Sequence, residues 1–142
     1  MSNYYVERAT IENVQDVWTL NELEGGSHEA RAALVDAARD HACLVARSGW
    51  NVRGFLIRQA SFFGYPLVSR VVVHPDERRQ GVGRLLMDYA EKTTPEDRLF
   101  AAVRGTNEAG TAFVTALGYT QCGEVSALHA DDVPEVIYVK HL

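Results

Sequence analysis

The alternation of apolar and polar positions along the chain predicts a single α/β (α+β) domain. Short apolar runs, several of them rich in β-branched residues, predict strands over residues 4–8, 42–48, 52–59, 66–73, 99–103, 122–128 and 136–140. Apolar residues at helical spacing predict four helices, which begin after Thr10, near Ser27, at Gly81 and near Ala109. The resulting order, β-α-α-β-β-β-α-β-α-β-β, predicts a mixed, largely antiparallel sheet flanked by helices on both faces.

The stretch from Val71 to Tyr89 carries the clearest chemical signal. Three valines end a strand, a polar loop containing Pro75 follows, and an amphipathic helix starts at Gly81. The free N–H groups and the positive dipole end of a helix N-terminus attract anions. Gly81 and Gly83 let a phosphate approach the backbone closely. The same stretch gathers three cations, which are Arg78, Arg79 and Arg84. It therefore predicts a site for a ligand that bears phosphate groups.

Spacing separates this stretch from two common nucleotide-binding motifs. The chain has no G-x-x-x-x-G-K-[ST] sequence, and the pattern G-x-G-x-x-G fails because Leu86 occupies the third glycine position. The remaining pattern, Arg78-x-x-Gly81-x-Gly83, resembles the acyl-CoA motif [RQ]-x-x-G-x-[GA] of the GCN5-related N-acetyltransferase (GNAT) family. The alternative interpretation is a surface turn that carries arginines without a ligand.

A second marker of the same family, N-x(10)-G-[FY], is met by Asn107, Gly118 and Tyr119. With two motifs in the right order, the resemblance covers nearly all of the chain. It implies one N-acetyltransferase (GNAT) domain over residues 1–142 with the acyl-CoA acyltransferase fold of that family. It also implies transfer of an acetyl group from acetyl-CoA to a primary amine of a small molecule or peptide, by direct attack in a ternary complex. A homodimer is expected from the family alone.

The resemblance assigns residues to the binding of acetyl-CoA. Backbone groups of Val71 and Val73 would pair with the pantetheine amides, as an added half-strand does. The N–H groups of residues 79–84 would hold the pyrophosphate, and Asn107 would bond the pantetheine arm. The amides of Val72 and Val73 would donate to the acetyl carbonyl oxygen. The complete set is Val71, Val72, Val73, Arg78, Arg79, Gln80, Gly81, Val82, Gly83, Arg84 and Asn107.

The chain departs from the family at the groups that move protons. Many members carry a tyrosine, as general acid, four residues before the glycine of the second motif, where this chain has Val114. Many also carry a glutamate on the strand before the anion loop, whereas residues 66–70 contain no carboxylate. Ser69, Glu24 and His28 are weak candidates for catalysis, and for each a role as an ordinary polar residue is favoured.

These departures shape the expected function. An acceptor with a low amine pKa, such as an α-amine, is expected because little help with deprotonation is visible. Two other classes of protein stay open. One is a catalytically degenerate CoA-binding regulatory domain, and the other is an α/β interaction domain without a nucleotide site. The acceptor and the use of acyl groups other than acetyl are left open.

Composition narrows the partners and the location. The chain has 142 residues and a net charge of −5, which argues against nucleic acid or an anionic membrane as partner. No apolar run is long enough to span a bilayer, and the N-terminus lacks the pattern of a signal peptide, so a cytoplasmic protein is expected. Cys43 and Cys122 lack metal-ligand spacing, which predicts two reduced thiols and no metal site.

Overall fold

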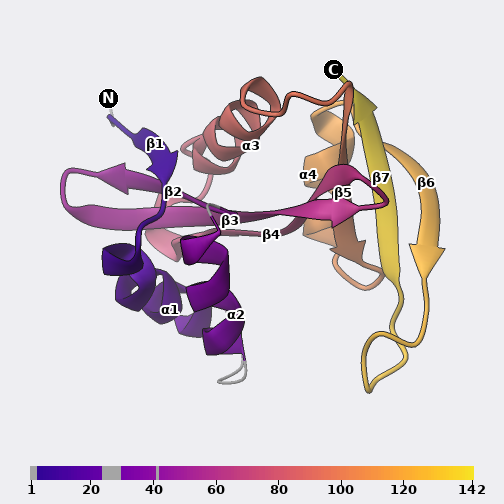
Figure 1. Cartoon of the computed structure of the whole chain (residues 1–142), viewed down its shortest axis with the longest axis horizontal. Coiled ribbons are helices and arrows are strands. Elements are labelled where there is room, and N and C mark those ends of the chain that lie inside the picture. Colours follow the sequence, from indigo (N-terminus) through magenta and orange to yellow (C-terminus); the bar gives the residue numbers. More distant parts are fainter. Residues whose placement is uncertain (1–2, 24–29, 41) are drawn as a thin grey trace.

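A computed structural model describes residues 3–23, 30–40 and 42–142 of the chain, with side chains of residues 30–34 left undescribed. Its elements follow the predicted order, with two short 3-10 turns added (Figure 1). They are β1 (Tyr5–Arg8), η1 (Ile11–Asn13), α1 (Val14–Leu23), α2 (Ala30–Arg39), β2 (Cys43–Ser48), β3 (Asn51–Phe62), β4 (Tyr65–Val73), η2 (Pro75–Glu77), α3 (Val82–Lys92), β5 (Arg98–Arg104), α4 (Glu108–Ala116), β6 (Thr120–Val125) and β7 (Glu135–His141).

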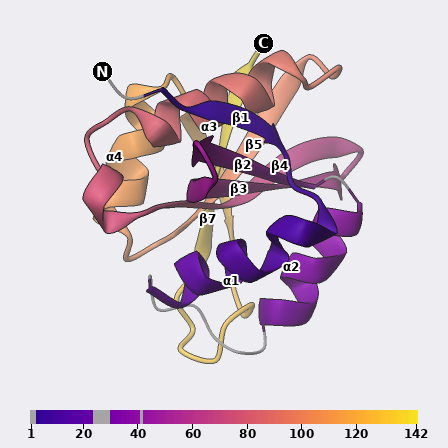
Figure 2. The same cartoon turned by 90° about the vertical axis from the view of Figure 1, so that its left-hand side faces the viewer.

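The described strands form one seven-stranded sheet in the order β1-β2-β3-β4-β5-β7-β6. Only the β4–β5 pair is parallel within this sheet as described, and every other neighbouring pair is antiparallel. Helices α1 and α2 lie on one face and α3 on the other (Figures 1 and 2). The expected mixed, largely antiparallel sheet flanked by helices is therefore confirmed.

The apolar side chains form two clusters, one on each face of the sheet. The larger cluster joins α3 and α4 to the sheet and includes the fully buried Leu56, Leu86 and Leu99. The smaller cluster joins α1 and α2 to the opposite face and includes Trp18 and Phe55. Trp18 is thus a core residue, as the helical pattern indicates.

Local bounds differ from the sequence-based expectation at two hairpins. Strand β3 continues to Phe62 because Phe63 and Gly64, with φ of +52° and +85°, make a two-residue turn into β4. Positive φ at both central positions matches the twist of a hairpin, so the strands run up to the turn. Strand β6 covers residues 120–125 instead of 122–128, because its pairing with β7 starts at Thr120 and ends at Val125.

Candidate active site

Strands β4 and β5 start side by side and then separate. They pair only at Leu67–Phe100 and Val68–Ala101 among the described residues, although both strands continue beyond these pairs. On its other edge, β4 stays paired with β3 to its last residue. The backbone edge of residues 69–73 therefore faces an opening in the sheet instead of a neighbouring strand, and this leaves amide and carbonyl groups available to a ligand.

A β-bulge at Ser69 accompanies the separation. Ile57 of β3 faces Arg70, and the next residue, Arg58, faces Val68, so Ser69 is an extra residue on β4. A bulge bends its strand and increases the local twist. Ser69 is one of the residues that line the opening, which places this candidate beside the site without testing its role.

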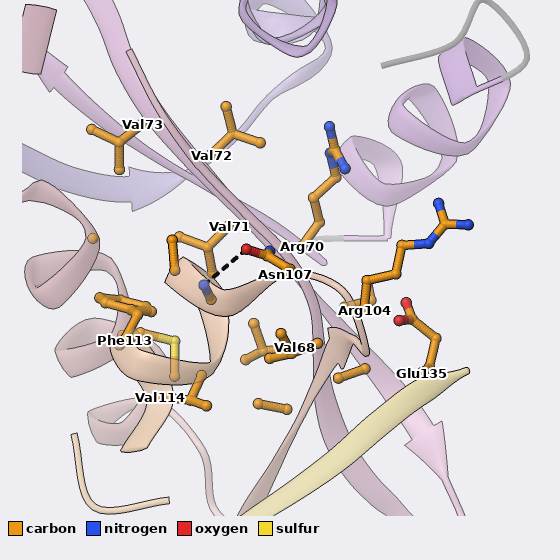
Figure 3. Close-up of a pocket in the computed structure, with 18 of the residues that line it drawn as sticks. Val68, Arg70, Val71, Val72, Val73, Arg104, Asn107, Phe113, Val114 and Glu135 are labelled. Atoms are coloured by element: carbon orange, nitrogen blue, oxygen red, sulfur yellow. Dashed lines mark hydrogen bonds between the residues drawn. The ribbon is translucent and has the colours of Figure 1, made fainter. Parts of the chain in front are cut away.

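The opening is a cavity of about 600 Å³ (Figure 3). It is lined by residues 68–73 of β4 and 101–104 of β5, by Gly83 and Met87 of α3, by residues of α4, and by Glu135 of β7. Figure 3 shows Phe113 and Val114 of α4 on one side of this cavity, and Arg70, Arg104 and Glu135 on the other. The cavity thus has an apolar side beneath α3 and α4 and a charged side toward α1.

A second cavity, of about 300 Å³, adjoins the first at the start of α3. The two share four lining residues, Val73, Arg78, Gly83 and Phe113. Arg79, Gly81, Val82 and Arg84 line the second cavity. Of the residues assigned to the cofactor from sequence, only Gln80 lines neither cavity in the part of the chain that is described, and it lies exposed in the same turn.

The start of α3 has the geometry of an anion site. Gly81 is the N-cap, and its carbonyl accepts the N–H of Leu85 at 3.0 Å, which is the first hydrogen bond of the helix. The N–H groups of residues 82–84 precede that bond and have no acceptor within the helix. They point out of the N-terminus beside Arg79 and Arg84, so helix and side chains contribute positive charge at one place.

Asn107 lies at the mouth of the main cavity as the N-cap of α4. Its Oδ1 accepts the N–H of Gly110 at 2.9 Å, drawn as the dashed line in Figure 3. Any larger residue at position 110 would bring a Cβ within 2.6 Å of Asn107 Nδ2, so Gly110 keeps room for the amide. Because Oδ1 serves as the cap, the amide would meet a ligand through its Nδ2 donor.

Three charged side chains, Arg70, Arg104 and Glu135, occupy the α1 side of the cavity. Sequence reasoning singled out neither Arg104 nor Glu135. Arg70 Nε donates to Asn21 Oδ1 of α1 at 2.7 Å. Arg104, the last residue of β5, faces Glu135, the first residue of β7, as cross-strand partners. Glu135 brings a carboxylate to the cavity, whereas the strand before the anion loop has none. The register between β5 and β7 is what brings it to the cavity, and no local pattern signals this register.

The tyrosines do not supply an obvious general acid. The hydroxyl of Tyr119 donates to Glu91 Oε2 at 2.8 Å. Burial, and to a smaller extent the hydrogen bond to Glu91, raise the pKa of Tyr119. Tyr119 is 3% exposed and packs in the core, as expected for the aromatic of its motif. Tyr138 is buried in β7 with its hydroxyl 3.5 Å from Thr111 Oγ1, while Tyr65 contacts Phe100 at the β3–β4 hairpin. None of the three lines either cavity described above.

Two further candidates, Glu24 and His28, lie outside the described residues.

The buried Cys43 is a free thiol whose pKa burial raises to about 12, and Cys122 is a free thiol exposed on β6. In the described part of the chain, no group of three or more His, Cys, Asp and Glu side chains is arranged to hold a metal ion. No described helix is long and apolar enough to cross a membrane.

Comparisons with known proteins agree with this geometry. The zebrafish (Danio rerio) "Probable N-acetyltransferase 14" is 33% identical over 91 residues, covering 62% of this chain but only 29% of that protein. A GNAT-family acetyltransferase from Bacillus cereus superposes with a TM-score of 0.87 at 22% identity, over 98% of this chain and 97% of the other. PaiA N-acetyltransferase from Thermoplasma acidophilum, solved with coenzyme A, superposes with a TM-score of 0.73 at 14% identity over 99% of both chains. The model of the acetyltransferase (GNAT) family matches residues 10–119, and the chain belongs to this family.

Proposed function

We propose that this chain transfers an acetyl group from acetyl-CoA to a primary amine by direct attack within a ternary complex. The observation that carries the proposal is the cavity between β4 and β5, which joins the anion site at the start of α3 to a charged side facing α1. A long phosphorylated thioester and a polar amine could reach the same opening from these two ends. Family membership and the coenzyme A bound in a protein of the same fold support this function.

Acetyl-CoA would follow the groove in one direction. Its pyrophosphate would accept hydrogen bonds from the N–H groups of residues 82–84, beside the three arginines of the loop. Its pantetheine amides would pair with the open backbone edge of residues 69–73, and Asn107 Nδ2 would donate to the same arm. The amides of Val72 and Val73 are proposed as donors to the acetyl carbonyl oxygen as negative charge develops on it.

The apolar Val114 at the usual tyrosine position suggests that the leaving thiolate is protonated without a phenol. Val114 is buried to 5% exposure and lines the cavity. A thiol has an ordinary pKa of about 8.5, so its thiolate is a tolerable leaving group near neutral pH. General acid catalysis typically contributes about 10²- to 10⁴-fold, so its absence slows a reaction without preventing it.

We also propose that the acceptor amine is an α-amine. At pH 7 a lysine-like amine with a pKa near 10.4 is neutral to only about 0.04%, whereas an α-amine with a pKa near 7.8 is neutral to about 14%. An active site with few groups that move protons is better matched to the second kind. Acetylation of lysine side chains alone, with none on α-amines, would contradict this part of the proposal.

The test has two steps. Thermal unfolding with acetyl-CoA at about 100 times its dissociation constant should show a stabilisation of about 2.7 kcal/mol, and NAD should cause none. Release of CoA should then depend on an added α-amine. The absence of any thermal shift at high acetyl-CoA concentration would overturn the proposal.

A catalytically degenerate CoA-binding domain is the second candidate, and the observation that favours it is again Val114. It predicts the same thermal shift without amine-dependent release of CoA. The second step of the test therefore separates the two functions.

A further inference from the structure

Two residues on the charged side of the cavity, Arg104 and Glu135, are cross-strand partners. Arg104 and Glu135 are Cα partners at the adjoining ends of β5 and β7. Leu99, Ala101 and Val103 of β5 pack in the α3 cluster, so the alternation of a strand places Arg104 on the opposite face of the sheet. Figure 3 shows both side chains on the side of the cavity away from α4.

Arg104 is hydrogen-bonded through one nitrogen and unmatched at another, whereas Glu135 faces His129 through one oxygen without a hydrogen bond and is unmatched at the other. Arg104 Nη2 donates to Asp131 Oδ2 at 2.6 Å, and Glu135 Oε1 lies 3.6 Å from His129 Nε2. Arg104 Nε and Glu135 Oε2 are out of contact with solvent and have no hydrogen-bond partner in the described structure. Buried polar atoms almost always have partners, and both residues line the main cavity. A ligand in the cavity could supply the missing donor and acceptor after a small shift of these two side chains.

We propose that Glu135 Oε2 binds the acceptor amine and takes its proton, while Arg104 Nε donates to an oxygen next to that amine. The chemistry that fits is an α-amino carbonyl group, in which two carbon atoms separate the amine nitrogen from the carbonyl oxygen. A free α-amino acid supplies it with a carboxylate, and the first residue of a peptide supplies it with a carbonyl. The inference rests on the proposed N-acetyltransferase function and names its acceptor class.

The proton and electron balance is simple. The ammonium gives one proton to Glu135, and the electron pair stays on nitrogen. The nitrogen attacks the acetyl carbonyl carbon, the C–N bond forms, and the C–S bond breaks with its electron pair on sulfur. The second proton of the nitrogen passes to the thiolate, which gives the amide and CoA. After the product leaves, Glu135 returns its proton to solvent through the exposed part of its side chain, which is 20% exposed as a whole.

Charged and titratable groups surround Glu135, and the acceptor amine sets the direction of the pH dependence. His129 faces Oε1, and Arg104 and its partner Asp131 lie on the β5 side. Arg70 lies on the same side of the cavity as Glu135. As the pH falls, more of the acceptor α-amine, with an ordinary pKa near 7.8, is held as the ammonium and must lose a proton before it can attack. The rate of acetylation should therefore decline on the acid side.

Glu135→Gln is the central test, measured as CoA release between pH 6 and pH 9. Acceptors are the common amino acids and tripeptides that begin with each of them. At pH 7 kcat should fall about 10²- to 10⁴-fold. The deficit should narrow toward pH 9, because an α-amine with a pKa near 7.8 is by then mostly neutral without a base. Glu135→Asp should restore part of the rate, and the thermal shift with acetyl-CoA should persist in both variants.

The matched control is Glu124→Gln, which removes an exposed carboxylate on β6 outside the cavity and should leave kcat unchanged. Equal activity of Glu135→Gln and this control would overturn the proposal, and so would a deficit that is constant with pH. Wild-type protein that acetylates other amines but no α-amine would overturn the inference and leave the enzymatic function standing. Protein that binds acetyl-CoA and acetylates no amine would overturn both.

Arg104→Met separates the two sources of the acceptor oxygen. Loss of a hydrogen bond between charged groups should raise KM by about 10- to 100-fold with little change in kcat. A rise in KM for free amino acids identifies their carboxylate as the partner of Arg104. A rise in KM for peptides identifies the first carbonyl group of the peptide as that partner. An unchanged KM for both would remove Arg104 from the acceptor site.

Discussion

The two glycines of the anion loop are required for different physical reasons. Gly81 has a φ of +81°, the left-handed region that favours glycine, and a Cβ there would meet open space. Gly83 is an ordinary helical residue, but its Cβ would lie 3.1 Å from the ring of Phe113. Gly81 therefore shapes the turn, whereas Gly83 allows α3 and α4 to approach each other beside the cavity.

Gly83→Glu should abolish the thermal shift caused by acetyl-CoA. The carboxylate would stand where we place the pyrophosphate, and Phe113 would have to move, so some loss of intrinsic stability is also expected. Unfolding without ligand measures the second effect separately. Gly123→Glu, on exposed β6 with no atom within 4 Å of the added Cβ, is the charge-matched control. Undiminished acetyl-CoA affinity in Gly83→Glu would contradict the assigned site.

Val114→Tyr should raise kcat, because it places a phenol that can protonate the leaving thiolate on the apolar side of the cavity. The gain is expected relative to Val114→Phe, which adds the same bulk without the hydroxyl, and its upper range is about 10²- to 10⁴-fold. Both variants overfill a buried position, at a cost of about 1–3 kcal/mol in the free energy of unfolding. If the two variants turn over equally, protonation of the thiolate does not limit the rate.

At the scale of elements, one ionic cluster anchors the turn that precedes the anion loop. Glu77 of η2 accepts hydrogen bonds from the hydroxyl of Tyr4 and, at 3.0 and 2.9 Å, from Nε and Nη2 of Arg53 on β3. The hydrogen bond from Tyr4, and then those from Arg53, lower the pKa of Glu77. Glu77 also lines the second cavity, at the start of α3, so this cluster connects the position of the loop to the rest of the sheet.

Glu77→Gln should therefore destabilise the fold in a pH-dependent way. Because the folded-state pKa is lowered, the stabilising contribution of Glu77 is present above its ordinary pKa of about 4.3 and is lost as the pH falls through the folded value. The variant should unfold at a lower temperature than wild type at pH 7, and the two midpoints should draw together as the pH falls below about 4.3 and Glu77 of the wild type becomes protonated. Glu124→Gln should follow wild type throughout. A gap that does not narrow at all as the pH falls below about 4.3 would mean that packing, and not ionisation, causes the loss.

The elements themselves were largely predictable, because their signals are local. Apolar periodicity predicted the order of strands and helices. All the residues that the motifs assigned to the cofactor, except Gln80, line the two adjoining cavities in the described part of the chain. The separation of β4 from β5 and the bulge at Ser69 were not predicted, because strand pairing joins residues far apart in sequence. Glu135 was missed for the same reason, since only the β5–β7 register brings it opposite Arg104.

For the whole molecule, the local charge of the anion loop differs in sign from the total. The net charge is −5, yet Arg78, Arg79 and Arg84 line one cavity at the positive end of α3. A polyanionic ligand is then attracted at short range by the loop and repelled at longer range by the rest of the surface. Salt screens both the attraction and the repulsion. Because the phosphates approach the loop closely, the attraction by the loop should dominate the electrostatic energy of binding.

Acetyl-CoA affinity should consequently weaken as salt rises. Between about 0.1 M and 1 M salt the Debye length falls from about 10 Å to about 3 Å, and we expect the dissociation constant to increase several-fold, on the order of ten at most. Acetyl-pantetheine, which has no phosphate and would contact only the β4 edge and Asn107, should bind more weakly but with little dependence on salt. Titration of both ligands by calorimetry separates the two parts of the groove. An equal salt dependence for both ligands would place the phosphates away from the arginine loop and require a different path for the cofactor.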